Sequence, residues 1–162
     1  MRMSEAVEWA LHTCLNLAWV GPDRPVPAAR LAAFYELPPA YLNKQLQALA
    51  RAGIVMSTSG PKGGFRLARD PARISLLDIV QAIEGPDGAF RCREIRQRGP
   101  FGDDPDNHHQ PCAIAAALAD AEQAWRDRLR ARTLADLGAT VDERAPAVPH
   151  RTREWLTGAT SS

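Results

Sequence analysis

The sequence predicts a mainly α-helical fold with one small two-stranded hairpin, and three observations lead to this prediction. Apolar residues recur at helical spacing along most of the 162 residues. Residues 54–58 and 65–67 instead are rich in strand-forming residues and flank a glycine-rich turn at 60–64. Two predicted helices, separated by a pair of prolines, come directly before that hairpin. This order predicts a winged helix-turn-helix, and a long helix predicted further on would serve for dimerisation.

Local signals set the ends of the predicted helices. The first ends at Gly21-Pro22, because glycine followed by proline stops a helical pattern. The second ends before Pro38, since a residue that precedes proline avoids the helical region. The third ends at Gly53, where glycine can adopt the left-handed conformation that closes a helix. The expected ranges are 4–20, 28–37, 40–52 and, after the hairpin, 74–84.

The third predicted helix has the two faces that a DNA-reading helix needs. Leu42, Leu46 and Leu49 fall on one side of it and polar residues fall on the other. Such a polar face can enter the major groove while the hairpin, or wing, reaches the flanking backbone. The candidate DNA-binding residues are Tyr41, Asn43, Lys44 and Gln47 on the helix and Lys62 and Arg66 on the wing. Any one of them, taken alone, fits an ordinary solvated surface residue at least as well.

The charge distribution favours the same half of the chain. Residues 1–75 carry nine Lys and Arg against five Asp and Glu, a net charge of +4, whereas residues 76–162 carry eleven against fourteen, a net charge of −3. A basic half supports contact with nucleic acid, although a mixed-charge solvated surface gives a similar count. Composition alone therefore leaves both interpretations open.

The chain beyond the wing divides into three predicted parts. An irregular loop over 89–111 contains His108 and His109, which are either further metal ligands or an exposed polar patch. Residues 112–137 have helical periodicity, as is typical of a long helix that packs against a partner chain. Residues 142–162 resemble a disordered tail. The predicted domains are a DNA-binding domain at 1–88, a loop at 89–111, a dimerisation helix region at 112–141 and the tail at 142–162.

Two pairs of side chains are candidate metal ligands. Glu8 and His12 are four residues apart, so they project from the same side of the first helix. Cys92 and Cys112 bracket the irregular loop, and Cys112 begins a helix, where free N–H groups favour the thiolate that ligates metal. The alternatives are an ordinary surface contact and two unrelated thiols. Cys14 lies within the apolar stripe of the first helix and is predicted to be a core thiol.

Composition and motifs exclude several classes of protein. No run approaches the roughly 20 apolar residues of a membrane span, and the first residues lack the pattern of a secretion signal, so we expect a cytoplasmic protein that makes no membrane contact. Three cysteines, an odd number, argue against a disulfide framework. No cysteine and histidine stand in a recognisable nucleophile setting, so we do not expect an enzyme.

Seven short stretches in a fixed order give the chain a resemblance to a known family. From about Ser4 to Val141 it resembles the iron–sulfur winged-helix transcriptional regulators of bacteria, the family of IscR and NsrR. It is most similar in pattern to the redox-sensing RsrR type. The matching stretches are 7–12, 27–32, 41–49, 51–55, 62–65, 77–82, and Cys92 with 94–100. Many relatives place three cysteines in the loop, whereas this chain has two.

The resemblance implies a homodimer that binds a two-fold symmetric, double-stranded DNA operator and represses transcription. It also implies a [2Fe–2S] cluster that senses redox or nitrosative state and that the loop at 89–111 helps to bind. In the RsrR pattern, Cys92 and Cys112 of one subunit and Glu8 and His12 of the other would supply the four ligands. Nitrogen and oxygen ligands leave less negative charge on a cluster than four thiolates, so its reduction potential should lie higher.

Two alternative interpretations remain open. One is a winged-helix regulator without a cluster, in which the cysteines act as thiol sensors or zinc ligands, and metal analysis distinguishes it. The other is an interaction adaptor that uses the helix at 112–137 and keeps the wing only as structure. Salt-dependent operator binding would argue against the adaptor, because phosphate contacts release counterions.

Overall fold

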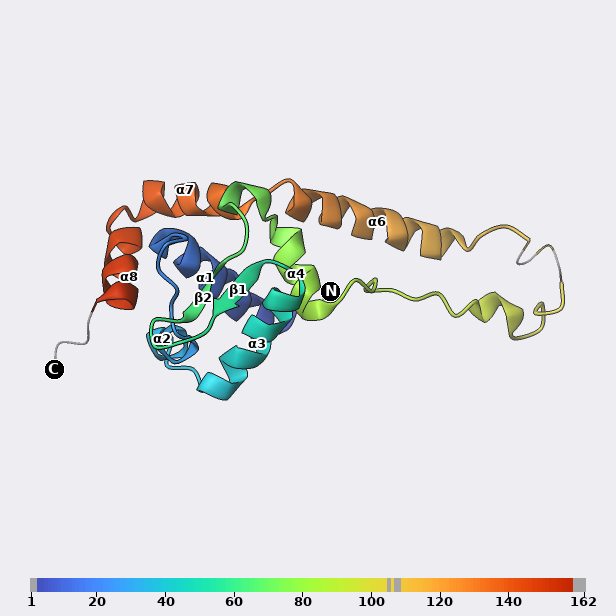
Figure 1. Ribbon diagram of the computed structural model, residues 1–162. Helices are drawn as coiled ribbons and strands as arrows, with labels where there is room; N and C mark the ends of the chain where they lie inside the picture. Colours follow the sequence, from blue (N-terminus) through green and yellow to red (C-terminus); the bar gives the residue numbers. More distant parts are fainter. Residues whose placement is uncertain (1–2, 105, 107–108, 159–162) are drawn as a thin grey trace. The chain divides into compact units, whose positions relative to one another are not determined.

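The computed structural model describes residues 3–104, 106 and 109–158, and it confirms a mostly helical winged helix-turn-helix (Figure 1). The chain divides into two compact units: residues 3–86 with 129–158, the winged-helix unit, and residues 87–128, the cysteine unit. The helices are α1 (Glu5–Val20), α2 (Ala28–Phe34), α3 (Pro39–Arg51), α4 (Leu76–Glu84), α6 (Ala113–Arg130), α7 (Leu134–Arg144) and α8 (Ala147–Thr157), and the strands are β1 (Val55–Thr58) and β2 (Gly64–Leu67). Within the described residues, no helix is long and apolar enough to cross a membrane.

Helix α1 runs through the core of the winged-helix unit. It packs against α3, α4, α7 and α8. Its inward-facing residues Ala10, Cys14 and Leu17 are at most 1% exposed. Burial raises the pKa of the Cys14 thiol to about 12, so this thiol stays neutral at physiological pH. The prediction that Cys14 is a core thiol is confirmed.

Helices α2 and α3 form the helix-turn-helix. The proline pair separates them, and Pro39 begins α3 in the first turn, where a missing N–H costs no hydrogen bond. Leu42, Leu46 and Leu49 on α3 are at most 1% exposed, so the predicted apolar face is the buried one. Gly53 follows the helix with a φ of +67°, which confirms the predicted left-handed end.

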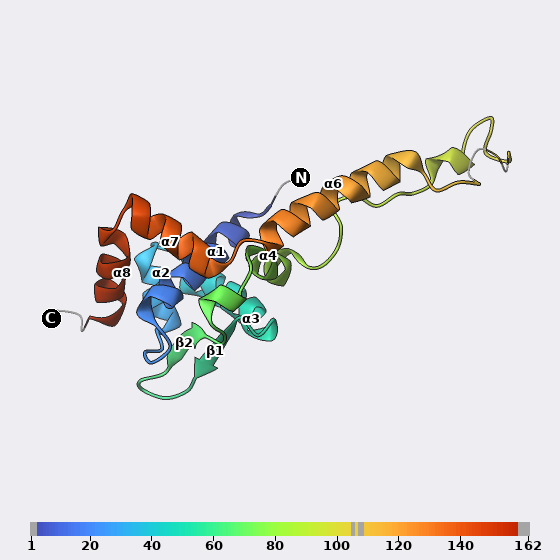
Figure 2. The same ribbon diagram turned by 90° about the horizontal axis from the view of Figure 1, so that it is seen from above.

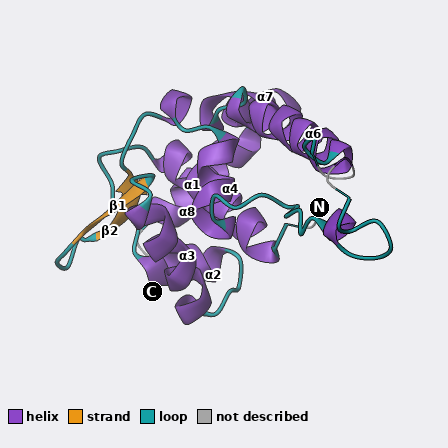
Figure 3. Ribbon diagram, turned by 90° about the vertical axis from the view of Figure 1, so that its right-hand side faces the viewer, coloured by secondary structure: helices purple, strands orange, loops and turns teal. Residues whose placement is uncertain are grey.

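Strands β1 and β2 form the wing, which projects beyond the helices (Figures 2 and 3). Val55 lies opposite Leu67 in the antiparallel register. Phe65 also exchanges two backbone hydrogen bonds with Val26, of 2.9 and 2.8 Å, so the segment before α2 acts as a short third strand. A Cβ atom on Gly64 would lie 2.4 Å from the Val26 carbonyl carbon, and only glycine fits this close approach. The wing is therefore tied directly to the helix-turn-helix.

Helix α4 confirms the helix predicted after the wing. The Ser75 hydroxyl accepts from the Asp78 N–H at 3.1 Å, and the Asp78 carboxylate accepts from the Ser75 N–H at 2.9 Å. This reciprocal capping box satisfies two N–H groups at the start of the helix. Ile79 and Val80 are buried as α4 packs against α1 and α3, so α4 supports the helix-turn-helix from the core side.

The single long helix predicted over 112–137 is wrong, because the structure contains two helices there. Thr133 and Asp136 form a second capping box, with hydrogen bonds of 3.1 and 2.8 Å, and this box begins α7 after α6 has ended at Arg130. Leu134 follows the cap and is fully buried. Thus α7 belongs to the winged-helix unit, whereas most of α6 belongs to the cysteine unit.

The disordered tail predicted over 142–162 is also wrong in the residues that the structure describes there. Helix α8 occupies most of them and packs against α1 and α2. The prolines that suggested breaks do not prevent a helix, because Pro146 precedes α8 and Pro149 lies in its first turn, where proline is tolerated. Thr152 and Leu156 are 4% and 3% exposed, so this helix completes the core.

Candidate functional sites

Helix α3 presents the polar face that the sequence predicted. Tyr41 is 37% exposed, and Asn43, Lys44 and Gln47 are exposed as well. Gln45 differs from these residues because it is buried against the core, at 6% exposure. The exposed face therefore carries an aromatic hydroxyl, two amides and one ammonium group. These groups can form hydrogen bonds with base edges and phosphates.

The wing adds a second basic surface to the winged-helix unit. Lys62 is exposed in the turn between the strands, and Arg66 is half-buried on β2 opposite Met56. The bonds between Phe65 and Val26 fix the base of the hairpin, so the positions of these two cations depend on the segment before α2. Both predicted wing residues are thus available to solvent, as contact with a DNA backbone requires.

The two predicted cysteine ligands lie together in the cysteine unit. Cys92 is close enough to Cys112 to contribute to the lowered pKa of its thiol, although the residues are 20 positions apart. Cys92 is exposed, and its sulfur also accepts from the Glu94 N–H at 3.4 Å. Two cysteines on the two sides of one loop, one of them at the surface, have the chemistry to supply two ligands of a metal site or to be oxidised.

The local structure of α6 acidifies one of these thiols. Cys112 directly precedes α6, and its pKa is lowered chiefly by the backbone N–H of Ala115. The N–H of Ile114, the neighbouring Cys92 and the charge of Arg96 act in the same direction, while partial desolvation opposes them. The sulfur therefore caps the helix, and the free N–H groups stabilise its thiolate form, as the sequence predicted.

Arg96 is a residue of this site that sequence reasoning missed. Its guanidinium binds both carboxylate oxygens of Glu94, at 2.5 and 2.7 Å, and donates to the Gln110 carbonyl at 3.0 Å. The bond to Gln110 joins the two sides of the irregular loop. In the sequence, the only signal was that Glu94 and Arg96 are two residues apart. Acidic and basic residues at this spacing are too common to identify a site.

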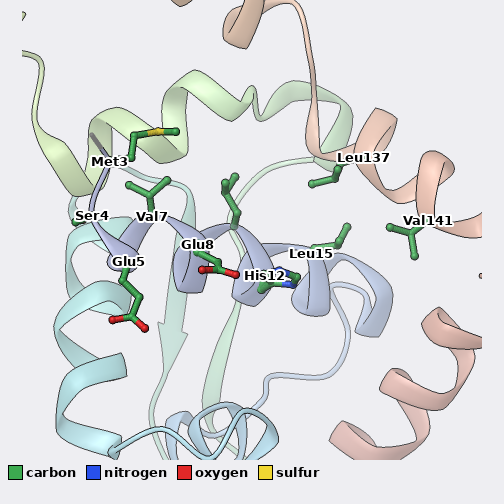
Figure 4. A pocket seen from close by; sticks show the side chains of 10 residues that line it. Met3, Ser4, Glu5, Val7, Glu8, His12, Leu15, Leu137 and Val141 are labelled. Carbon is green, nitrogen blue, oxygen red and sulfur yellow. The ribbon is translucent and has the colours of Figure 1, made fainter. Parts of the chain in front are cut away.

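Glu8 and His12 lie exposed on the same side of α1, as predicted (Figure 4). They line an open cavity of about 470 Å³ whose walls are otherwise mostly apolar and come from α1, from Met3 and Ser4 before it, and from Leu137 and Val141 of α7. The Nδ1 atom of His12 lies 3.4 Å from the Tyr35 hydroxyl. A carboxylate and an imidazole at the edge of an apolar cavity can serve as metal ligands or as polar anchors for a partner surface.

The four predicted ligands come from both compact units. The cysteines belong to the cysteine unit, and Glu8 and His12 belong to the winged-helix unit. Among the described residues, no three His, Cys, Asp or Glu side chains of one chain gather in a metal-binding group. Of the further predicted ligands, His109 is exposed, and His108 lies outside the described residues.

Comparison with known proteins places these features in a group of regulators. Residues 3–140 match the family model Rrf2, described as an iron-dependent transcriptional regulator. A protein of Rhodopseudomonas palustris named as an HTH-type transcriptional regulator, BadM, is 32% identical over 142 residues, which cover 88% of this chain and 84% of that protein. The structure of CymR, the global cysteine regulator of B. subtilis, covers 86% of this chain and 98% of CymR, with a TM-score of 0.67 and 24% identity. The structure of T. potens IscR covers 90% of this chain and 91% of IscR, with a TM-score of 0.67 and 21% identity.

Proposed function

The chain belongs to the Rrf2 family of transcriptional regulators, and from this premise we propose a finer function for a DNA-binding protein. It acts as a homodimeric repressor that senses redox or nitrosative state through a [2Fe–2S] cluster. Cys92 and Cys112 of one subunit and Glu8 and His12 of the other are the ligands. The named relatives are regulators rather than enzymes, which leaves the adaptor interpretation without support.

One observation carries this proposal: Cys92 and Cys112 lie on the two sides of the irregular loop, and Cys92 is close enough to Cys112 to contribute to the lowered pKa of its thiol. The two cysteines are 20 positions apart in the sequence. The hydrogen bond from Arg96 to the Gln110 carbonyl joins the two sides of the loop that separates them. Since the pKa of Cys112 is lowered, the pair offers more thiolate at a given pH than an ordinary cysteine does. Thiolates are the ligands that iron–sulfur clusters prefer.

The donor set fits a cluster shared between subunits. A [2Fe–2S] cluster takes four ligands, and among the described residues one chain gathers fewer than three such side chains at any place. The carboxylate of Glu8 and the imidazole of His12 sit at an open cavity on α1, where a second subunit can reach them. When bound, the cluster would supply one-electron redox chemistry.

Helix α6 supplies a surface for the second subunit. It spans Ala113–Arg130, and none of its described residues is buried. Ile114 is 69% exposed and Leu118 is 42% exposed, and Trp125 lies on the same face. A monomer rarely leaves such an apolar stripe open to water, so pairing with a second copy is the simplest way to cover it.

Helix α1 connects the candidate ligands to DNA binding. Glu8 and His12 project from α1, and α1 packs directly against the reading helix α3. A shift of α1 in one cluster state therefore changes the position of α3 in its own subunit and the spacing of the two reading helices in the dimer. A switch of this kind requires that operator DNA bind the two states with different affinity.

Protein purified without oxygen tests the proposal. Wild-type protein should contain iron and sulfide and absorb visible light, and Cys92→Ala and Cys112→Ala should both remove the absorption. Cys14→Ala is the matched control, because Cys14 is fully buried in the core and should leave the cluster in place once folding is checked by circular dichroism. Colourless, iron-free wild-type protein would contradict the sensor proposal.

A second candidate function rests on the same sulfur pair. Two neighbouring thiols can form a disulfide, so a cluster-free regulator could use Cys92 and Cys112 directly as a thiol sensor or, with other ligands, as a zinc site. Metal analysis separates the three cases: the cluster sensor would contain iron, the zinc site would contain zinc, and the thiol sensor would contain neither metal. In the thiol case, mass spectrometry after mild oxidation should find a Cys92–Cys112 disulfide.

A further inference from the structure

Tyr35 is the side chain that links α2 to the predicted ligand face of α1. It follows the last residue of α2, and its N–H donates to the Ala32 carbonyl at 3.2 Å, so its backbone closes the first helix of the helix-turn-helix. Its ring packs edge-on against His12, with centroids 5.6 Å apart, and against Phe34 at 4.8 Å. These contacts hold the Tyr35 ring beside one turn of α1.

The Tyr35 hydroxyl lies between two polar groups of α1. It donates to the Oδ1 atom of Asn16 at 3.4 Å and lies 3.4 Å from the Nδ1 atom of His12. Glu8, His12 and Asn16 follow each other at four-residue intervals and so share one side of the helix. Asn16 is only 1% exposed, and its Oδ1 atom is the one that faces the hydroxyl, while its Nδ2 atom is buried without a hydrogen-bond partner among the described residues.

A tyrosine hydroxyl has one proton to donate. With that proton donated to Oδ1 of Asn16, the hydroxyl oxygen is the acceptor toward His12. The hydrogen bond then requires a proton on Nδ1 of the imidazole. A neutral imidazole with its proton on Nδ1 has its free lone pair on Nε2.

We propose that Tyr35 is a positioning residue that holds His12 in the Nδ1–H tautomer and so leaves Nε2 as the atom for metal ligation. The metal-binding part of this inference rests on the proposed function, whereas the tautomer does not. Ligating histidines commonly donate their second ring N–H to a fixed acceptor, which sets both tautomer and ring orientation. Here the acceptor is the residue that ends α2, so one hydrogen bond links the ligand to the helix-turn-helix.

Nitrogen NMR on cluster-free, full-length protein labelled with ¹⁵N-histidine tests the tautomer. The spectra are recorded as the pH is raised, and the alkaline limit, where the signals no longer change with pH, gives the neutral form. The chain has four histidines, and His12→Gln assigns the signals of His12. In wild-type protein the His12 signals should be those of protonated Nδ1 and unprotonated Nε2.

The variant Tyr35→Phe removes the hydroxyl and keeps the ring. It should move the His12 signals toward the Nε2–H tautomer, which free neutral histidine prefers. The signals of His150, which faces Glu154 on α8 at 3.4 Å, should not move and serve as the control in the same sample. Asn16→Leu should produce the same shift as Tyr35→Phe, because without the Asn16 acceptor the Tyr35 proton can turn toward Nδ1.

Cluster-loaded protein gives the second readout. Tyr35→Phe should still bind iron through the cysteines but lose it to a chelator roughly tenfold faster, the usual scale for removal of a partner of a ligating histidine. Wild-type protein that binds no iron would defeat the proposed function and leave the tautomer result standing. A wild-type His12 in the Nε2–H form, or one unchanged by Tyr35→Phe, would overturn the inference whatever the iron content.

Discussion

The guanidinium of Arg30 on α2 lies over the indole ring of Trp155 on α8, 5.4 Å from its centroid, and its Nε donates to the Trp155 carbonyl at 3.0 Å. These residues are 125 positions apart. Phe34 meets the same indole edge-on at 5.1 Å, and Arg153 of α8 donates to the Trp19 carbonyl of α1 at 2.6 Å. Helix α8 thus joins the first helix of the helix-turn-helix to the end of α1.

Removal of the buried anchor of α8 should destabilise the winged-helix unit. Leu156 is 3% exposed, so Leu156→Ala should lower the free energy of unfolding by about 2–4 kcal/mol through lost burial and a cavity. Val148→Ala is the matched control, because Val148 is 39% exposed on the same helix and its truncation should cost under about 0.5 kcal/mol. Urea denaturation followed by circular dichroism measures both, and equal effects would mean that α8 is not docked in solution.

The lysines of α3 and the wing should contribute to operator binding differently from the amide of Gln47. Lys44→Ala and Lys62→Ala should weaken binding to all sequences and each reduce the salt slope of log K by about 1, as loss of a phosphate contact does. Gln47→Ala should instead cost about 1–3 kcal/mol on the operator and relax its sequence preference. Fluorescence anisotropy over a salt series, on operator and scrambled duplexes, separates the two behaviours. A salt slope unchanged in every variant would refute this assignment.

The close approach at the base of the wing should make Gly64 intolerant of any side chain. Gly64→Ala places a Cβ atom 2.4 Å from the backbone of Val26, so the two hydrogen bonds between Val26 and Phe65 must break or shift. Gly138→Ala is the control, since a Cβ there meets Leu15 at an ordinary 3.8 Å and alanine suits a helix better than glycine. We expect Gly64→Ala to lower the melting temperature and weaken operator binding, and Gly138→Ala to leave both unchanged or raise the melting temperature. Hydrogen exchange at the Phe65 N–H reports directly on the wing.

The lowered pKa of Cys112 should appear in its chemical reactivity. In the cluster-free protein, the rate of alkylation by iodoacetamide should reach half of its maximum below pH 9.0, the ordinary value for the thiol. Because the folded-state pKa is the lower one, the thiolate contributes stability that is present above the unfolded-state pKa and is lost as the pH falls through the folded-state pKa. Peptide mass spectrometry gives the pH profile of each cysteine.

The helix start provides a matched pair of variants for the same measurement. Ala115→Pro removes the N–H that contributes most to the lowered pKa, so it should move the alkylation midpoint of Cys112 upward. Ala113→Pro changes the first helical residue, whose N–H is not among the donors to the sulfur, and should leave the midpoint in place. Equal midpoints in the two variants, with helicity retained, would show that the helix start is not the cause.

A charge placed on the apolar stripe of α6 should dissociate the proposed dimer. Ile114→Glu and Leu118→Glu each put a carboxylate into a surface that a second copy would cover, so sedimentation should shift from dimer to monomer. Ala116→Glu adds the same charge on the opposite side of the helix and should leave the dimer intact. A dimer that survives both stripe variants would place the subunit contact elsewhere.

The helix-turn-helix and the wing could be predicted from the sequence because their signals are local. The leucines of α3 repeat at helical spacing, Gly53 ends that helix, and a glycine-rich turn separates two short strand patterns. The interpretation of the chain as a mainly α-helical winged helix-turn-helix is confirmed for these reasons. Each signal depends on a few neighbouring residues, and no distant contact is needed to read it.

The parts that were missed depend on distant contacts. The pattern over 112–137 looked continuous, and the capping box at Thr133 was visible only as one Thr and one Asp three residues apart. The prolines before and within α8 suggested a break in the chain. The segment is nevertheless helical, because one face of it is buried against α1 and α2. Arg96 and Tyr35 gained their importance from partners that the sequence does not place beside them.

The match to the family model ends at residue 140, so α8 lies outside the matched part of the chain. In this protein the aromatic side chain of Phe34 rests against that extra helix. A shorter relative that stops near residue 140 has no indole to shield this spot from water. We therefore expect the identity of the residue aligned with Phe34 to vary with chain length across the family, apolar in long members and polar in truncated ones.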